Sequence, residues 1–163
     1  MNQVLKGGTV VTGSGSFRED VLIHGEKVVA VGSPEEIERL TDRDTGVVDV
    51  EGCLLFPGFI DAHTHFDLHV AGTVTADDFA TGTKAAVRGG TTTIVADPHE
   101  IVNVCGAQAV QYLLDATENL PLNVYLMLPS SVPATPFETN GADFTAADMA
   151  PFMAHPRVLG LGE

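Results

Sequence analysis

Two histidines separated by one residue form the strongest chemical signal in this sequence. His63 and His65 follow an apolar run that starts at Phe56, in the order FPGFIDAHTH. Side chains two residues apart on a β-strand point to the same side, so both imidazoles can reach one metal ion. Imidazole nitrogen is a common ligand of zinc and other transition metals. The spacing predicts a metal site, in which Asp61 either orients a ligand or is a structural hydrogen-bond acceptor.

Polar residues also follow other apolar segments. Glu163 ends the segment RVLGLGE and is expected to be a third metal ligand from another strand end. The segment Asp97-Pro-His-Glu100 follows TTTIVA and places two acids and an imidazole within four residues. Such groups just beyond a strand are suited to acid–base catalysis or substrate contact. We expect His99 and Glu100, together with Glu163, to be catalytic and Asp97 to bind substrate. The alternative for Asp97–Glu100 is a polar loop.

A long loop over residues 129–141 contains three prolines. Long ordered loops beside an active site often hold substrate, so Ser130 and Ser131 are predicted substrate-binding residues. An inert surface excursion is the alternative. The other histidines, His24, His69 and His155, have no convergent partners in the sequence and are expected at the surface.

The composition limits the classes of partner. The chain has 163 residues, of which 22 are acidic and 8 basic, giving a formal net charge of -14. Nucleic acids and anionic membranes require a positive face, so we expect neither as a partner. The sequence shows no signal peptide and no apolar run of membrane-spanning length, which predicts a cytoplasmic protein. Cys53 and Cys105 are too few for a disulfide framework and are expected to be buried free thiols.

Residues 1–56 are expected to form a small β domain. Glycine-rich turns interrupt short β-branched runs, a pattern typical of an antiparallel sheet, here of β-sandwich type. Ser33 and Glu36 have the spacing of a capping box and predict a helix over residues 34–40. The expected strands are Val4-Leu5, Thr9–Val11, Val21–His24, Lys27–Val31 and Val47–Val50.

Residues 57–163 show a different pattern, in which strand, loop and helix repeat. This is typical of parallel β/α units and predicts the α/β class. We expect about four units of a (β/α)8 TIM barrel, truncated after the fourth strand, because eight units need about 250 residues. Thr75 and Thr145 precede Asp78 and Asp148 by three residues and are predicted N-caps. The expected strands are Phe59–Ala62, Thr91–Ala96, Asn123–Leu128 and Val158–Gly162, and the expected helices are Ala76–Arg88, Gly106–Glu118 and Thr145–Ala154.

The candidate residues follow the four expected strands, where a parallel barrel places its active site. Together they resemble the metal-dependent amidohydrolase superfamily over nearly the whole chain. Residues 1–95, especially His63–Asp67 and Gly72–Phe79, are similar to dihydropyrimidinases and hydantoinases. Residues 96–163 are similar to bacterial adenine deaminases. The matching segments there are ADPHEI at 96–101, Asn103, MLPS at 127–130, VPATPFET at 132–139 and GLGE at 160–163.

The second set is longer and more specific, so the resemblance implies hydrolytic deamination of adenine to hypoxanthine and ammonia. Glu163 would bridge two divalent ions, manganese or iron with zinc as an alternative, and His63 and His65 would hold the more buried ion. Asn103 joins the predicted substrate-binding residues on this basis. Hydantoinase-like enzymes use a carboxylated lysine in place of the glutamate. None of the chain's three lysines lies near the end of the fourth expected strand, so hydrolysis of a cyclic amide is the second hypothesis after adenine deamination.

The resemblance also implies that further histidine ligands and a proton-shuttling aspartate come from later barrel strands. We therefore expect the 163-residue chain to be a fragment that is inactive alone. An open half barrel leaves unpaired strand edges and an uncovered apolar interior. A homo-oligomer or a complementary chain is expected to cover them, and a non-catalytic half barrel is the remaining alternative.

Overall fold

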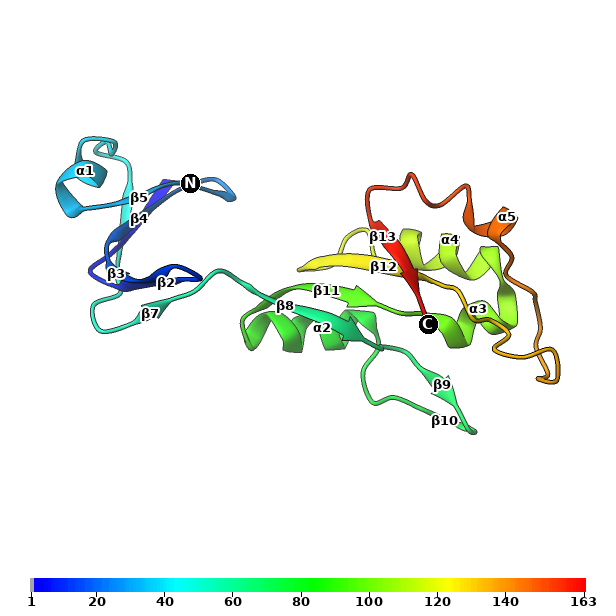
Figure 1. Cartoon of the computed structure of the whole chain (residues 1–163). Helices are drawn as coiled ribbons and strands as arrows, with labels where there is room; N and C mark the ends of the chain where they lie inside the picture. Colours follow the sequence, from blue (N-terminus) through cyan, green and yellow to red (C-terminus); the bar gives the residue numbers. More distant parts are fainter. Residues whose placement is uncertain (1) are drawn as a thin grey trace. The chain divides into compact units, whose positions relative to one another are not determined.

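The computed structural model describes residues 2–163, and its contacts divide the chain into two compact units (Figure 1). The first unit ends at Pro57 and the second begins at Gly58. None of the helices in the described residues is long and apolar enough to cross a membrane.

The first unit contains two small sheets among its described residues, with strand orders β5-β4-β1-β6 and β3-β2-β7. Its hairpins are antiparallel, but β1 pairs with β6 and β2 with β7 in parallel. The prediction of one antiparallel sheet was therefore wrong, because these parallel partners are distant in sequence and no local turn announces them. The strands are β1 Asn2–Lys6, β2 Thr9–Thr12, β3 Gly15–Arg18, β4 Asp20–His24, β5 Lys27–Gly32, β6 Gly46–Asp49 and β7 Leu54–Leu55.

The helix α1, Pro34–Glu38, begins as the sequence predicts. Ser33 accepts a hydrogen bond from the Glu36 N–H, and the Glu36 carboxylate accepts one from the Ser33 N–H, which completes the capping box. Ile37 is buried against Val4 and Leu22 in the core of this unit. The helix ends two residues earlier than predicted.

The second unit is built on a parallel four-stranded sheet in the order β13-β12-β11-β8. Each of the four predicted strands is present, because runs of β-branched and apolar residues suit a buried sheet. The strands are β8 Phe59–Thr64, β11 Thr91–Ala96, β12 Asn123–Pro129 and β13 Val158–Gly162. Since all four run in the same direction, their carboxyl ends lie along one edge of the sheet.

The helices of the second unit are α2 Phe79–Arg88, α3 His99–Cys105, α4 Ala107–Ala116 and α5 Ala146–Met149. Helix α2 begins later than predicted, with Asp78 rather than Thr75 as its N-cap, and Asp78 forms a capping box with Thr81. Thr145 caps α5 as predicted, but the helix ends at Met149 rather than at Ala154. Helix α3 was not predicted, because Asp97-Pro98 suggested a loop; Pro98 instead precedes the first helical turn, where a missing N–H is tolerated.

Helix α2 packs on β11 and α3 packs on β12, and Figure 1 shows α2, α3 and α4 alongside this sheet. A short antiparallel hairpin, β9 His69–Val70 and β10 Thr73–Val74, extends from the segment between β8 and α2. In the main core, alternate residues of the strands pack against one side of α3 and α4. Its largest fully buried members are Ile94, Val102, Val110, Val124, Leu126 and Leu128.

The two cysteines are free but exposed, so the prediction that they are buried was wrong. Cys53 lies in the turn before β7, and Cys105 ends α3 on its solvent side. Cysteine is often buried in proteins, but these two positions fall outside the apolar faces of their elements.

Candidate metal and substrate site

The end of β8 presents the two histidines together, as their spacing predicts. The Nε2 atoms of His63 and His65 lie 3.0 Å apart, and the rings are 4.9 Å apart between centroids. The backbone N–H of His63 donates to Oδ1 of Asp61 at 3.2 Å. Asp61 therefore holds the backbone at the strand end, and this bond does not orient an imidazole ring. When two nitrogens bind the same metal ion at about 2.1 Å each, they lie about 3.0–3.4 Å from each other. The geometry of the pair therefore fits a shared ion.

His99 and Glu100 lie in the first turn of α3, and they face the histidine pair. Nε2 of His99 is 2.7 Å from Oε1 of Glu100, and Nδ1 of His65 is 3.7 Å from Oε2 of the same carboxylate. The rings of His65 and His99 meet edge to face at 5.2 Å. Ligand atoms of His65, His99 and Glu100 all lie within 4.8 Å of one another. The structure thus joins the ends of β8 and β11 into one cluster.

Asp97 and Glu163 extend this cluster to the end of β13. The Glu163 N–H donates to Oδ2 of Asp97 at 3.0 Å, and Oε2 of Glu163 lies 3.6 Å from Nδ1 of His99. Asp97 is buried, whereas the Glu163 side chain is 63% exposed. Glu163 therefore reaches the histidine pair through His99 and Glu100. Its predicted role as a shared ligand with His63 and His65 stays a prediction.

The predicted substrate-binding residues have different surroundings. Ser130 donates from Oγ to the carbonyl oxygen of Gly162 at 2.8 Å, so it contacts the end of β13. Ser131 is exposed in the long loop. Asn103 lies in α3, where its backbone carbonyl accepts from the N–H of Gly141 and thereby anchors that loop. Substrate binding by these residues, like that of Asp97, stays a prediction.

Unpartnered polar atoms also mark this region as a site for a bound group. Within residues 2–163, the buried side-chain atoms that lack a hydrogen-bond partner are Oδ1 of Asp97, Nδ1 of His99 and Oδ1 of Asn103. Buried polar groups without partners are rare in folded proteins because each costs about 1–3 kcal/mol. Imidazole and carboxylate donors together suit a divalent transition ion. The residues present therefore fit such a metal.

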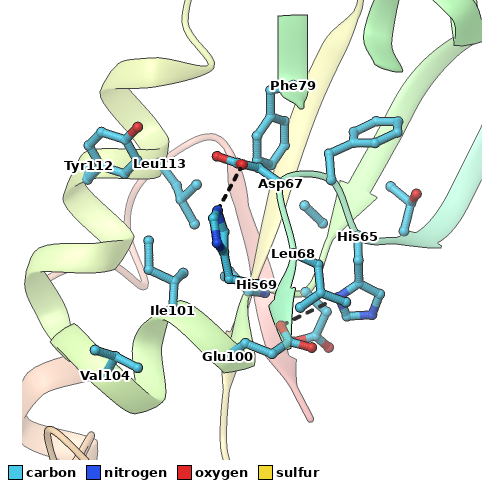
Figure 2. Close-up of a pocket in the computed structure, with 15 residues that line it drawn as sticks. His65, Asp67, Leu68, His69, Phe79, Glu100, Ile101, Val104, Tyr112 and Leu113 are labelled. Atoms are coloured by element: carbon cyan, nitrogen blue, oxygen red, sulfur yellow. Dashed lines mark ion pairs between the residues drawn. The ribbon is translucent and has the colours of Figure 1, made fainter. Parts of the chain in front are cut away.

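A pocket of about 400 Å³ adjoins the cluster, and His65 and Glu100 line it (Figure 2). Asp97 belongs to the same lining. Its other wall is mainly apolar and comes from the segment after β8, from the start of α2 and from α3 and α4. Asp67 and His69 also line it, with Oδ1 of Asp67 3.4 Å from Nε2 of His69. The apolar lining includes Leu68, Phe79, Ile101, Val104, Tyr112 and Leu113.

Sequence reasoning missed most of this lining. His69 is exposed, as expected, but its ion pair with Asp67 places it at the pocket. Asp67 has a φ of 54°, in the left-handed region that few non-glycine residues adopt. No sequence pattern signalled that α4 would contribute Tyr112 and Leu113, because the contact joins segments more than 40 residues apart. His24 is exposed, as expected, whereas His155 is half-buried and its Nδ1 accepts a hydrogen bond from the N–H of Arg157.

Comparison with known proteins agrees with this cluster of histidines and acids at strand ends. Residues 54–158 match the model of the amidohydrolase family. Adenine deaminase of Desulfitobacterium hafniense (strain Y51) is 45% identical over 160 residues, covering 98% of this chain and 26% of that protein. Adenine deaminase of Halalkalibacterium halodurans is 44% identical over 148 residues, which cover 91% of this chain and 23% of that protein.

Among solved structures, dihydropyrimidinase from Brevibacillus agri NCHU1002 has a TM-score of 0.67 and 39% identity, covering 80% of this chain and 28% of that one. These findings confirm the resemblance to adenine deaminases and to dihydropyrimidinases, each over most of the chain. The chain spans about a quarter of the length of the relatives it matches. The family model covers well over half of the chain and includes β8, β11 and β12 with the clustered residues between them. The chain therefore belongs to the amidohydrolase family.

Proposed function

We propose that this chain supplies part of the active site of an adenine deaminase, which converts adenine and water to hypoxanthine and ammonia. The observation that carries the proposal is the 45% identity to an adenine deaminase over 98% of the chain. In this reaction, water adds to the ring carbon that bears the amino group. The carbon–nitrogen bond then breaks, and the amino nitrogen takes up a proton and leaves as ammonia.

His63, His65 and Glu163 are the proposed metal ligands, and Glu163 is the proposed bridge between two ions. Manganese or iron is the expected metal, with zinc as an alternative. A bound divalent ion supplies Lewis acidity, which lowers the pKa of water toward 7. The orphaned nitrogen of His99 and the His63–His65 separation of 3.0 Å support a cation here.

His99 and Glu100 are the proposed acid–base residues. Their 2.7 Å contact lets a proton pass between the imidazole and the carboxylate. Both side chains are partly exposed, at 31% and 25%, so a substrate can reach them. The adjoining pocket, with its apolar wall, is the proposed site of the planar purine ring.

A specific observation distinguishes this reaction from opening of a cyclic amide. Of the chain's three lysines, Lys6 and Lys27 lie in the first unit and Lys84 lies in α2. The residue after β13 is Glu163, whereas the resemblance implies a carboxylated lysine there in a hydantoinase. Hydantoin or dihydropyrimidine hydrolysis is therefore the second candidate, favoured by the resemblance of residues 1–95 and by the structural likeness to dihydropyrimidinase.

We also propose that β8, β11, β12 and β13 correspond to the first four strands of a TIM barrel, with residues 1–56 as a separate β domain and 57–163 as the barrel portion. In the described residues, β8 and β13 are the edges of this sheet. They expose large apolar side chains at Phe59, Ile60, Leu159 and Leu161. A complementary segment or another copy of the chain is the proposed cover. A cytoplasmic location remains part of the proposal.

A chimera tests the function directly. Residues 2–163 would replace the matching segment of the Desulfitobacterium hafniense enzyme, and ammonia release from adenine would be assayed beside ring opening of dihydrouracil and hydantoin. We expect turnover of adenine alone. A chimera carrying His63→Ala and His65→Ala is the matched control and should be inactive. A folded, metal-loaded chimera that opens hydantoin and ignores adenine would overturn the assignment.

A further inference from the structure

Glu163 has an exposed side chain on a backbone that is held from two other strands. Resting on the proposed role of Glu163 as a metal ligand, we infer that Asp97 and Ser130 are positioning residues that aim Glu163 at the metal site. This role differs from the substrate contacts that their places in the sequence suggest.

The first contact comes from Asp97, at the carboxyl end of β11. Its Oδ2 accepts the Glu163 N–H at 3.0 Å, although the two residues are 66 positions apart and β12 lies between their strands. The Asp97 side chain is only 4% exposed, so this bond forms away from water. A hydrogen bond to a buried carboxylate is stronger than one between neutral groups. Asp97 therefore anchors the last peptide of β13.

The second contact comes from Ser130, which directly follows β12. Its Oγ donates to the carbonyl oxygen of Gly162 at 2.8 Å, and its N–H donates to the carbonyl oxygen of Glu163, also at 2.8 Å. The Asp97 and Ser130 contacts engage the N–H and the carbonyl groups on either side of the Glu163 Cα. The backbone that carries the Glu163 side chain is thus fixed in rotation as well as in position.

Gly162 makes this close approach possible. A Cβ at this position would lie 2.3 Å from Oδ2 of Asp97 and 2.7 Å from Cβ of Met127. Both distances are shorter than real Cβ contacts, so any larger residue would displace the Asp97 carboxylate. The absence of a side chain at 162 therefore brings Asp97 within hydrogen-bonding distance of the Glu163 N–H.

The consequence is seen at the other end of Glu163. Its Oε2 lies 3.6 Å from Nδ1 of His99, and the same nitrogen lies 3.9 Å from the orphaned Oδ1 of Asp97. A free glutamate side chain at 63% exposure samples many rotamers, and a fixed backbone limits where its carboxylate can go. Partners that orient a metal ligand typically change metal affinity by about 10–100-fold when removed.

The experiment measures Mn²⁺ affinity of the 163-residue chain by the EPR signal of the free ion, together with hydrogen exchange of the Glu163 amide. Asp97→Ala should weaken Mn²⁺ binding by about 10-fold or more and speed exchange of that amide. Asp97→Asn keeps an oxygen acceptor for the N–H and should retain most of the affinity. Gly162→Ala should reproduce the Asp97→Ala result from the opposite side of the contact.

Matched controls separate positioning from general damage. Asp115→Ala removes an exposed carboxylate of α4, and Gly13→Ala adds a methyl group where nothing lies within 4 Å. Neither should change Mn²⁺ affinity. If Gly162→Ala fails to fold, Ser130→Ala replaces it, with a smaller loss expected because the Ser130 N–H contact remains.

Each outcome decides a separate point. Fast exchange of the Glu163 amide in the wild type would show that the contact does not hold, whatever the metal does. Unchanged Mn²⁺ affinity in Asp97→Ala, even with a lower melting temperature, would make Asp97 merely structural and overturn the inference alone. Equal losses in Asp97→Asn and Asp97→Ala would indicate that Asp97 is itself a ligand, also against it. A wild type that binds no Mn²⁺ would overturn both the proposed metal site and this role.

Discussion

Asp20 in the first unit and Asp97 in the second are buried equally, each about 3% exposed, but their surroundings differ. Oδ1 of Asp20 accepts the N–H of Gly7 at 2.8 Å and so closes a turn between β1 and β2. Oδ1 of Asp97 has no partner and lies 3.9 Å from Nδ1 of His99. Burial alone therefore does not distinguish a structural carboxylate from a functional one. The distinction lies in whether a carboxylate oxygen is left without a hydrogen-bond partner.

The same contrast extends over the two units. Apart from Asp20, the polar side chains of the first unit pair with near neighbours or at the surface, as Ser33 does with Glu36 and Arg18 with Glu51. In the described part of the chain, the buried unpartnered side-chain atoms all belong to the second unit, at Asp97, His99 and Asn103. Functional sites are where a fold leaves such groups unsatisfied. The contrast supports the proposal that the second unit carries the active-site residues.

The largest effect is expected from removing the histidine pair. His63→Ala/His65→Ala should weaken Mn²⁺ binding by more than about 100-fold, because the pair is the proposed set of direct ligands and such ligands contribute more than the residues that orient them. His24→Ala, at the exposed end of β4, is the control and should leave binding unchanged. Elemental analysis after dialysis measures the bound metal. Equal metal content in the wild type and the double variant would break the contrast between the two units.

A smaller effect, confined to stability, is expected from Asp20→Ala. The change leaves the Gly7 N–H without its acceptor and should lower the free energy of unfolding by about 1–3 kcal/mol. Mn²⁺ affinity should stay at the wild-type value. Asp115→Ala should cost less than about 0.5 kcal/mol as an exposed control. Urea unfolding and Mn²⁺ titration of the same samples check both points, and reduced Mn²⁺ affinity in Asp20→Ala would contradict the structural role.

Local patterns predicted much of this fold. The His63–His65 spacing predicted that both imidazoles lie close together at the end of β8, and β-branched runs located the four parallel strands. Capping boxes at Ser33 and Thr145 located two helix starts. These signals depend on residues within a few positions of one another, so they can be read without knowing the tertiary structure.

What the sequence did not predict depends on distant contacts or competing local signals. Asp78 rather than Thr75 caps α2, because its carboxylate reaches the Thr81 N–H at 2.7 Å. The contact of Asp97 with the Glu163 N–H joins residues 66 positions apart, so position after a strand suggested a substrate contact instead. Pocket lining by Tyr112 likewise depends on how α4 packs.

The smallest effect concerns exposed caps, which should behave alike in both units. The Ser33 N–H and hydroxyl lower the pKa of Glu36, and the Thr81 N–H and hydroxyl lower the pKa of Asp78. A carboxylate whose folded pKa is lowered stabilises the fold fully above its unfolded pKa, about 4, and loses that contribution as pH falls through the folded pKa. The melting temperature should therefore decline below about pH 4.

Glu36→Gln and Asp78→Asn remove the titrating groups and should each make that decline slightly shallower, measured by circular dichroism between acidic and neutral pH. A decline as steep as that of the wild type in both variants would show that these caps do not contribute to the acid sensitivity of either unit.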